Sequence, residues 1–249
     1  PVEPGRRCRL APERTGHRVD VVPRTECVEQ LIAFEYAACH TSEAVKRLQY
    51  AAAAGLPVVC YPGIIPGAAS PITLSGTLAQ SGAEILAGLV IHQLENPGAP
   101  VLSGSSILPM DMKTGCITYG SPEYAAACTA AVDFFSYLDI PSWAGGGCSD
   151  APCPGSQAAA EAQLTMNAAV QSGTGFIHNA GYLSSGRCAS LEMLVLADEL
   201  IRLNEQLCMP IDCSDEALGF ELIKKAAFSK SADEYMASEH TMKYLRSSM

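Results

Sequence analysis

The sequence predicts an α/β fold in which helices alternate with the strands of a parallel sheet. Two observations indicate this fold. Four times between Leu56 and Leu207, a short apolar run is followed by a turn of small residues and a long helical stretch. Two of those stretches begin with the same Ser-Pro pair, at Ser70 and at Ser121. This spacing is typical of βαβ units, and 249 residues suffice for one barrel or one doubly wound domain.

The four repeats define the expected elements. Each apolar run should form a strand, and the runs are residues 56–65, 99–107, 140–148 and 174–183. The expected helices are residues 71–94, 121–138, 156–170 and 188–207. Parallel α/β folds bind ligands at the carboxyl ends of their strands. We therefore expect the chemistry in the loops at residues 61–70, 104–120, 145–155 and 178–187.

Two of the helix starts have a simple physical explanation. Ser70 can cap the helix that begins at Pro71, because a proline in the first turn lacks an N–H that would have no partner there. Ser121, Pro122 and Glu123 repeat the arrangement and add an acidic side chain, which the positive end of the helix dipole favours.

The segments that flank the repeats carry weaker patterns. Residues 1–23 are expected to be a loop, whereas apolar residues at helical spacing predict helices within residues 24–54, the second capped by Thr41 or Ser42. Residues 214–229 predict one amphipathic helix. No strand is evident in either segment.

We divide the chain into residues 1–54, a loop and helical lead-in, and residues 55–249, a partial barrel with a helical tail. Only four βα units are legible, whereas a closed barrel of this type needs eight. The chain also begins with Pro1. We expect it to be a piece of a longer protein.

Charge and hydropathy exclude several classes of protein. The net charge of −10 argues against a nucleic-acid or anionic-membrane surface, where Lys and Arg should dominate. The longest weakly polar stretch, residues 85–90, is too short to span a bilayer, and no secretory signal is evident. We expect a cytoplasmic protein, with oligomers possible because an incomplete barrel exposes sheet edges.

Eleven cysteines are an odd number, so a complete set of disulfides is excluded. Most lie in helical or strand patterns, Cys116 among them, and we interpret them as reduced, buried residues. Cys148 with Cys153, and Cys208 with Cys213, share one spacing, but neither is a CxxC pair and no His lies at ligand spacing. We assign no metal site.

His178 is the most informative single residue. It ends the fourth apolar run, where a side chain at a strand's carboxyl end can contact a ligand. Asn179 and Tyr182 are its nearest polar neighbours in sequence. The alternative is a core histidine whose ring is satisfied by the backbone.

Three further residues are candidates for ligand contact. Gln80 and Glu84 lie four apart on one face of a predicted helix, which could instead be its solvated side. Asp150 follows three glycines and the single Trp143, and a carboxylate beside an indole can hold a quaternary ammonium ion. Asp150 could instead cap the helix at residue 156. Asp111 is expected to order a turn.

Several stretches in order resemble the trimethylamine methyltransferase family of corrinoid-dependent methyltransferases. They cover roughly residues 50–241 and include GAASPITL, GSPE, IHNAGYL followed by SLEM and ADE, then EY and HT, at residues 67–74, 120–123, 177–183, 190–193, 197–199, 234–235 and 240–241. The resemblance implies a (βα)8 barrel about twice as long as this chain.

The resemblance also implies a reaction: transfer of a methyl group from a methylated amine to the Co(I) of a separate corrinoid protein, with no cofactor held tightly by this chain. Trimethylamine enzymes of the family carry pyrrolysine, whereas the corresponding segment here, residues 183–186, has standard residues only. The chain therefore looks more like members that use quaternary amines such as glycine betaine. His178, Asn179, Asp150, Gln80, Glu84 and Tyr182 are the expected substrate contacts.

Two alternatives stay open. One is a different barrel enzyme that uses His178 as a general base and needs no corrinoid protein. The other is a non-catalytic fragment that only binds ligand or corrinoid protein.

Overall fold

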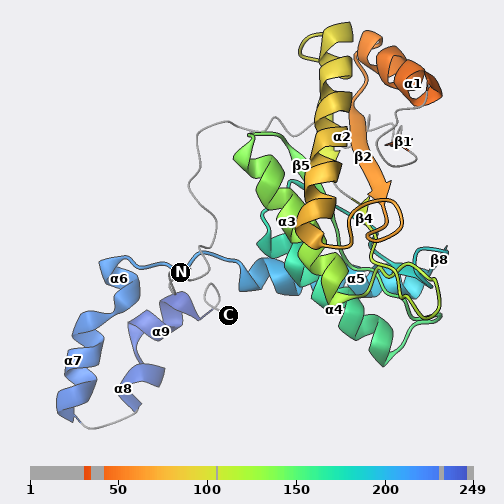
Figure 1. Ribbon diagram of the computed structural model, residues 1–249. Coiled ribbons are helices and arrows are strands. Elements are labelled where there is room, and N and C mark those ends of the chain that lie inside the picture. The colour runs from red at the N-terminus through yellow and green to blue at the C-terminus, as the bar shows by residue number, and fades with distance from the viewer. Residues whose placement is uncertain (1–30, 35–41, 105, 230–232, 246–249) are drawn as a thin grey trace. The chain divides into compact units, whose positions relative to one another are not determined.

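The computed structural model describes residues 31–34, 42–104, 106–229 and 233–245. The chain divides into two compact units, one ending at Cys208 and the other beginning at Met209 (Figure 1). The first unit holds the sheet and its helices, and the second is a small helical unit.

The sheet of the first unit is parallel and follows the order of the chain. Its strands lie in the order β1-β2-β3-β5-β6, and the short β4 pairs with β2. A strand order without reversal is consistent with a segment of a barrel, whereas a doubly wound sheet reverses at a switch point. The strands are β1 (Leu31–Phe34), β2 (Val58–Ile64), β3 (Val101–Gly104), β4 (Ser106–Ile107), β5 (Ser142–Gly145) and β6 (Phe176–His178).

All four predicted strand–helix repeats are confirmed. A helix follows each of the strands β2, β3–β4, β5 and β6. The first described helix, α1, lies between β1 and β2. A small antiparallel hairpin, β7 (Tyr182–Leu183) with β8 (Cys188–Ala189), lies between β6 and the last of these helices. The helices are α1 (Ser42–Ala53), α2 (Leu74–Glu95), α3 (Pro122–Tyr137), α4 (Ser156–Gln171) and α5 (Leu191–Leu207).

Strand register separates the sheet into two unlike faces, because paired residues of a parallel ladder face the same side and neighbours along a strand face opposite sides. One face packs on helices: Val58 and Cys60 lie against α1, and Ala144 lies against α3 and α4. We call this the helix-covered face. The other, here the open face, carries Tyr61, Gly104, Gly63, Trp143, Gly145, Phe176 and His178.

The prediction of helix across residues 24–54 is wrong for Leu31–Phe34, which form β1 beside β2. Leu31, Ile32 and Phe34 fit a helical or a strand pattern equally well, and pairing with the edge of β2 selects the strand. Helix α1 is confirmed from Ser42, and Thr41 lies outside the described residues, as do residues 1–23.

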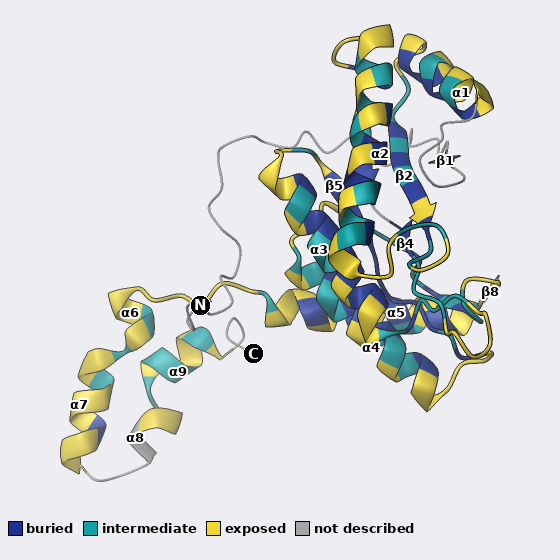
Figure 2. Cartoon of the chain, in the orientation of Figure 1, coloured by how far each residue is buried: buried dark blue, intermediate teal, exposed yellow. Residues whose placement is uncertain are grey.

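Helix α2 differs from its prediction at its start and in its buried face. Its cap is Thr73, whose hydroxyl accepts from the N–H of Gly76 at 3.3 Å, and not Ser70. Polar Thr77, Ser81 and Glu84 are buried, so the polar stripe is not a solvated side. Figure 2 shows exposed residues along another side of α2. The apolar side chains of Val90 and Leu94 are among the exposed residues of this helix.

By length and composition, α2 could cross a membrane. The expectation that the longest weakly polar stretch is only residues 85–90 is therefore wrong, because the apolar part of this helix is longer. The helix packs on β2 and lies against α1 and α3. Buried Glu84 and His92 also face protein along its length. These are the contacts of a helix inside a folded domain.

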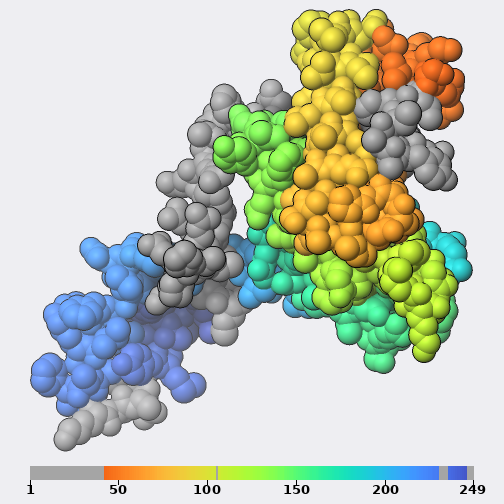
Figure 3. Space-filling view, in the orientation of Figure 1, coloured from red at the N-terminus to blue at the C-terminus, as the bar shows by residue number. Residues whose placement is uncertain are grey.

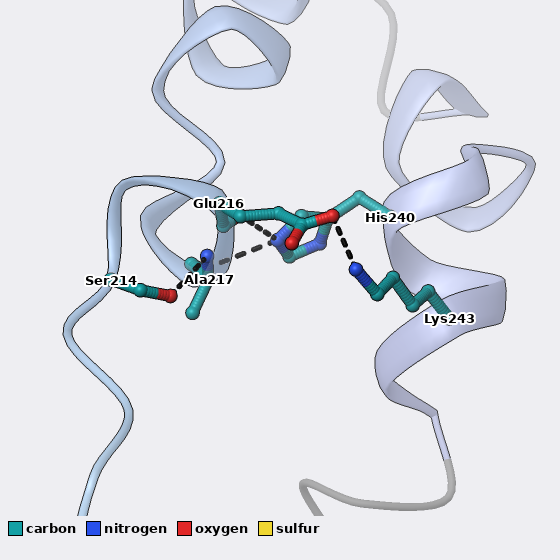
Figure 4. Close-up of polar contacts among 5 residues, drawn as sticks. All are labelled: Ser214, Glu216, Ala217, His240 and Lys243. Atoms are coloured by element: carbon teal, nitrogen blue, oxygen red, sulfur yellow. Dashed lines mark hydrogen bonds and ion pairs between the residues drawn. The ribbon is translucent and has the colours of Figure 1, made fainter.

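The described residues of the second unit form four short helices. The predicted single helix at 214–229 is divided by Gly219, whose φ of +58° ends the first of two helices. In Figure 4 the Nε2 of His240 lies 3.1 Å from the carbonyl oxygens of both Glu216 and Ala217, and Lys243 pairs with the Glu216 carboxylate. Two acceptors require a protonated Nε2. The helices are α6 (Asp215–Leu218), α7 (Phe220–Ser229), α8 (Asp233–Met236) and α9 (Glu239–Tyr244).

Candidate functional site

Aromatic side chains gather beside β2, β5 and β6: Tyr61, Trp143 and His178 lie on the open face, and Tyr119 and Tyr182 belong to the segments that follow β4 and β6. The ring centroids of Tyr61 and Trp143 are 5.3 Å apart, those of Trp143 and His178 are 5.9 Å apart, and those of His178 and Tyr182 are 6.0 Å apart. All three contacts are edge-to-face, a favoured arrangement of aromatic rings. The ring of Tyr119 lies at the same end of the sheet, with its centroid 5.2 Å from that of Tyr124. The aromatic cluster consists of Tyr61, Tyr119, Trp143, His178 and Tyr182.

Gly104 makes room for the indole of Trp143. A Cβ at Gly104 would lie 2.0 Å from the indole Nε1, a distance that no real side chain tolerates. Trp143 is only 5% exposed, and its Nε1 has no hydrogen-bond acceptor among the described residues. A buried donor without an acceptor is unfavourable, so the site offers a hydrogen bond to an incoming oxygen.

A buried hydrogen-bond chain orients His178. The phenol oxygen of Tyr124 accepts from Asn179 Nδ2 at 3.0 Å, which turns Asn179 Oδ1 toward a close contact with His178 Nδ1. That oxygen can only accept, so Nδ1 of His178 carries a proton and donates it. Gly145 permits the chain to form, because a Cβ there would lie 1.8 Å from the Tyr124 oxygen.

The phenols of the site stay protonated well above neutral pH. Burial, followed by the nearby charges of Tyr61 and Cys148, raises the pKa of Tyr119 to about 12. Burial and the charge of Tyr182 raise the pKa of Tyr61. Burial also raises the pKa of Tyr124 well above its usual value. Tyr61 and Tyr119 therefore offer neutral ring faces with negative π potential, the surface that attracts organic cations.

Asp150 joins two loops at the same end of the sheet. Its carboxylate accepts from the backbone N–H of Tyr119 at 2.7 Å and of Gly120 at 3.0 Å. It therefore holds the loop that carries Tyr119. The alternative interpretation as a helix cap is wrong, because the N-cap residue of α4 is Gly155 and no side chain caps that helix.

Gln80 and Glu84 form a separate group. The Gln80 amide donates to the backbone oxygen of Ala69 and to the Glu84 carboxylate, each at 3.0 Å. The pair thus fixes the loop that follows β2. Of the six residues predicted to contact ligand, the structure gathers His178, Asn179 and Tyr182 at the aromatic cluster and connects Asp150 to it through Tyr119.

The other polar loops have structural explanations. Asp111 accepts from the N–H of Lys113 at 2.9 Å and from the hydroxyl of Thr114 at 2.7 Å, which confirms the predicted turn. No disulfide or group of three metal-ligating side chains occurs among the described residues. The described cysteines are free, but the expectation that most are buried is wrong for this part of the chain. Only Cys60, Cys128 and Cys148 are buried, whereas Cys116, Cys153, Cys188 and Cys213 are exposed.

Sequence reasoning missed Tyr61, Tyr119 and Tyr124. Tyr61 and Tyr119 do lie within the loops where ligand contacts were expected, at 61–70 and 104–120. Alternation along the strand at 56–65 would have placed Tyr61 opposite the residues that pack on helices. No local pattern indicates Tyr124, because it looks like an ordinary core residue in the first turn of a helix.

The chain matches known methyltransferases along most of its length. The family model described as trimethylamine methyltransferase (MTTB) matches residues 16–248. The trimethylamine methyltransferase MttB of Desulfitobacterium hafniense is 33% identical over 207 residues, 83% of this chain. That of Methanosarcina thermophila is 34% identical over 177 residues, 71% of this chain.

A relative with a different named substrate matches equally well. The glycine betaine methyltransferase of Desulfitobacterium hafniense is 31% identical over 193 residues, 77% of this chain. The matched regions are 40%, 37% and 40% of these three relatives, so the chain spans well under half of their length.

Proposed function

The chain belongs to the trimethylamine methyltransferase family, and from that premise we propose that it is part of an enzyme that moves a methyl group from a methylated amine to the Co(I) of a separate corrinoid protein. The preferred donor is a quaternary amine such as glycine betaine. The reaction takes place in the cytoplasm, and the whole activity belongs to a longer protein.

The aromatic cluster is the observation that carries this proposal. A quaternary ammonium ion has no N–H with which to hydrogen-bond, so a protein recognises it through ring faces and charge. Tyr61, Trp143 and Tyr182 supply neutral rings at the end of the sheet where parallel α/β folds bind ligands. The net charge of −10 also favours the approach of a cation.

This reaction requires the protein to position the methyl donor but not to activate its leaving group. In the transfer the N–CH₃ bond breaks, its electron pair stays on nitrogen, and the methyl group passes to cobalt. A quaternary ammonium leaves as a neutral amine, so no general acid is required. The task is to aim one methyl group along the line of attack, which a rigid set of rings can do. The Tyr124–Asn179 chain fixes the His178 ring for the same purpose.

The exposure of the open face favours the hypothesis that further strands of the longer protein enclose the site. All described helices that pack on the sheet cover its other face, as in a barrel whose interior is lined by strand side chains. We propose that the remaining part of the longer protein completes this barrel over Tyr61, Phe176 and His178.

Two measurements test the proposal. Trp143 is the single tryptophan, so its fluorescence reports on the cluster directly. We expect glycine betaine to change that fluorescence in a saturable way, and His178→Ala to weaken the effect. In a second assay, the chain and the full-length protein are mixed with Co(I) cobalamin, with glycine betaine or trimethylamine as donor, and the visible spectrum is followed.

The outcomes separate the competing functions. Methyl transfer by the full-length protein from glycine betaine supports the proposal. Fluorescence saturation with no transfer by this chain alone identifies a binding fragment. If the full-length protein transfers no methyl group from either donor, the substrate proposal is wrong. Turnover of a substrate without any corrinoid would instead favour His178 as a general base.

A further inference from the structure

We propose that Arg187 binds the carboxylate of a zwitterionic donor, so that the site selects betaines over methylated amines that carry positive charge alone. This inference rests on the proposed function, because it assumes that the aromatic cluster holds the ammonium group. It concerns a cavity at the loop end of the sheet that none of the expected contacts includes.

The cavity lies between two loops. Its volume is about 220 Å³, and its walls come from the loop after β4 and from the tip of the β7–β8 hairpin. Figure 3 shows the loops that follow β2 and β4 and the β7–β8 hairpin at one end of the first unit. The lining residues are Gly115, Cys116, Ile117, Ser185 and Arg187.

Among the described residues, Arg187 is the only charged one that lines the cavity. Its Nε donates to the backbone oxygen of Ser184 at 3.0 Å, which anchors the side chain and leaves the two terminal nitrogens as donors. By contrast, Arg47 and Arg202 form ion pairs within their own helices, and no such pair is found for Arg187 in the described part of the chain. An anchored guanidinium without a carboxylate partner is suited to bind one in two-pronged fashion.

The cavity adjoins the aromatic cluster. A Cβ built on Gly186 would lie 3.0 Å from the ring of Tyr119, so that ring packs directly against the residue beside Arg187. One ligand could therefore place its ammonium group among the rings and its other end toward the hairpin.

Charge distinguishes the candidate donors. Glycine betaine carries both a trimethylammonium group and a carboxylate, so it can satisfy the rings and Arg187 together. Choline carries the same trimethylammonium group with a neutral hydroxyl, and protonated trimethylamine carries only the cation. For these two ligands Arg187 offers repulsion in place of an ion pair, which is how a site rejects a near relative of its substrate.

Choline and glycine betaine form a matched pair of probes. We expect the full chain, titrated at low ionic strength and followed by Trp143 fluorescence, to bind glycine betaine about 10-fold to 100-fold more tightly than choline, because only glycine betaine offers Arg187 a carboxylate. Arg187→Gln should bring the two affinities within about threefold, chiefly by weakening glycine betaine. Arg187→Lys, which keeps the charge but not the planar fork, should give an intermediate ratio.

Lys113→Gln is the control, since it removes the same charge from the neighbouring loop at a residue that does not line the cavity. It should leave the ratio of the two affinities unchanged. Circular dichroism of each variant verifies that the fold is retained.

Equal affinity of the unaltered chain for glycine betaine and choline would overturn the role of Arg187 and leave the aromatic cluster standing. Retention of the preference by Arg187→Gln would overturn that role as well. If neither ligand changes the fluorescence or is bound in calorimetry, the proposed function fails too, and the inference falls with it.

Discussion

The two faces of the sheet are built from the same strands but carry different kinds of side chain. On the helix-covered face, small apolar residues such as Val58, Cys60 and Ala144 are almost fully buried. On the open face the neighbouring positions hold Tyr61, Trp143 and His178, large rings with polar edges. Because side chains alternate along a strand, one face holds the buried residues that stabilise the fold and the other holds the rings of the proposed site.

Truncation of one ring among the covering helices and of one ring on the open face gives the sharpest test of that difference. Phe135→Ala removes a fully buried ring that packs on Ile85 and Ala131, and should lower the free energy of unfolding by about 3–5 kcal/mol. Phe176→Ala removes the same atoms from the open face, where the ring is 46% exposed, and should cost less than about 1 kcal/mol. Urea denaturation of both variants measures the contrast, and equal losses would break it.

Thiol chemistry offers a second comparison of buried and loop positions. Burial raises the pKa of Cys60, on the helix-covered face, and of Cys148 to about 12. Only thiolates react with alkylating agents, so these thiols should react about 1000-fold more slowly than an ordinary thiol. Exposed Cys116 and Cys188 should be labelled first when mass spectrometry follows the reaction with iodoacetamide in the native protein. Early labelling of Cys60 would show that α1 does not cover the sheet.

Alkaline titration probes the aromatic cluster itself. The pKa of Tyr119 in the folded protein, about 12, exceeds its ordinary value of 10.0, so the neutral phenol is favoured by folding. This contribution is present below about pH 10 and is lost as pH rises toward about 12, because the unfolded chain then releases the proton more readily. Phenolate absorbance should therefore show a late phase that Tyr119→Phe reduces. A titration that is identical in the variant would contradict the burial of this ring.

Two glycines on the open face provide the mildest test. Gly104→Ala places a methyl group against the indole and must displace Trp143, whereas Gly63→Ala adds a methyl group with nothing within 4 Å. We expect the first to weaken glycine betaine binding about tenfold, since a desolvated cation–π contact contributes about 1–2 kcal/mol. The second should leave binding unchanged. Similar affinities for both variants would show that the indole does not contact the ligand.

The sequence by itself determined the four strand–helix repeats and the end of the sheet that carries the site. Those features are local: apolar runs of strand length, Ser121 before Pro122, and His178 at the end of its run follow from spacing and from backbone chemistry. Family membership was also legible, because it depends on ordered short stretches and not on distant contacts.

Only the tertiary structure decided which residues meet. Whether Leu31–Phe34 is a strand depends on a free edge of β2, and no local pattern contains that information. The Tyr124–Asn179–His178 chain joins residues 55 positions apart. The polar stripe of α2 is buried because neighbouring elements supply its partners, as the loop oxygen of Ala69 does for Gln80. Hydrogen bonds and ring contacts between distant segments form only when packing brings the segments together, so sequence spacing cannot specify them.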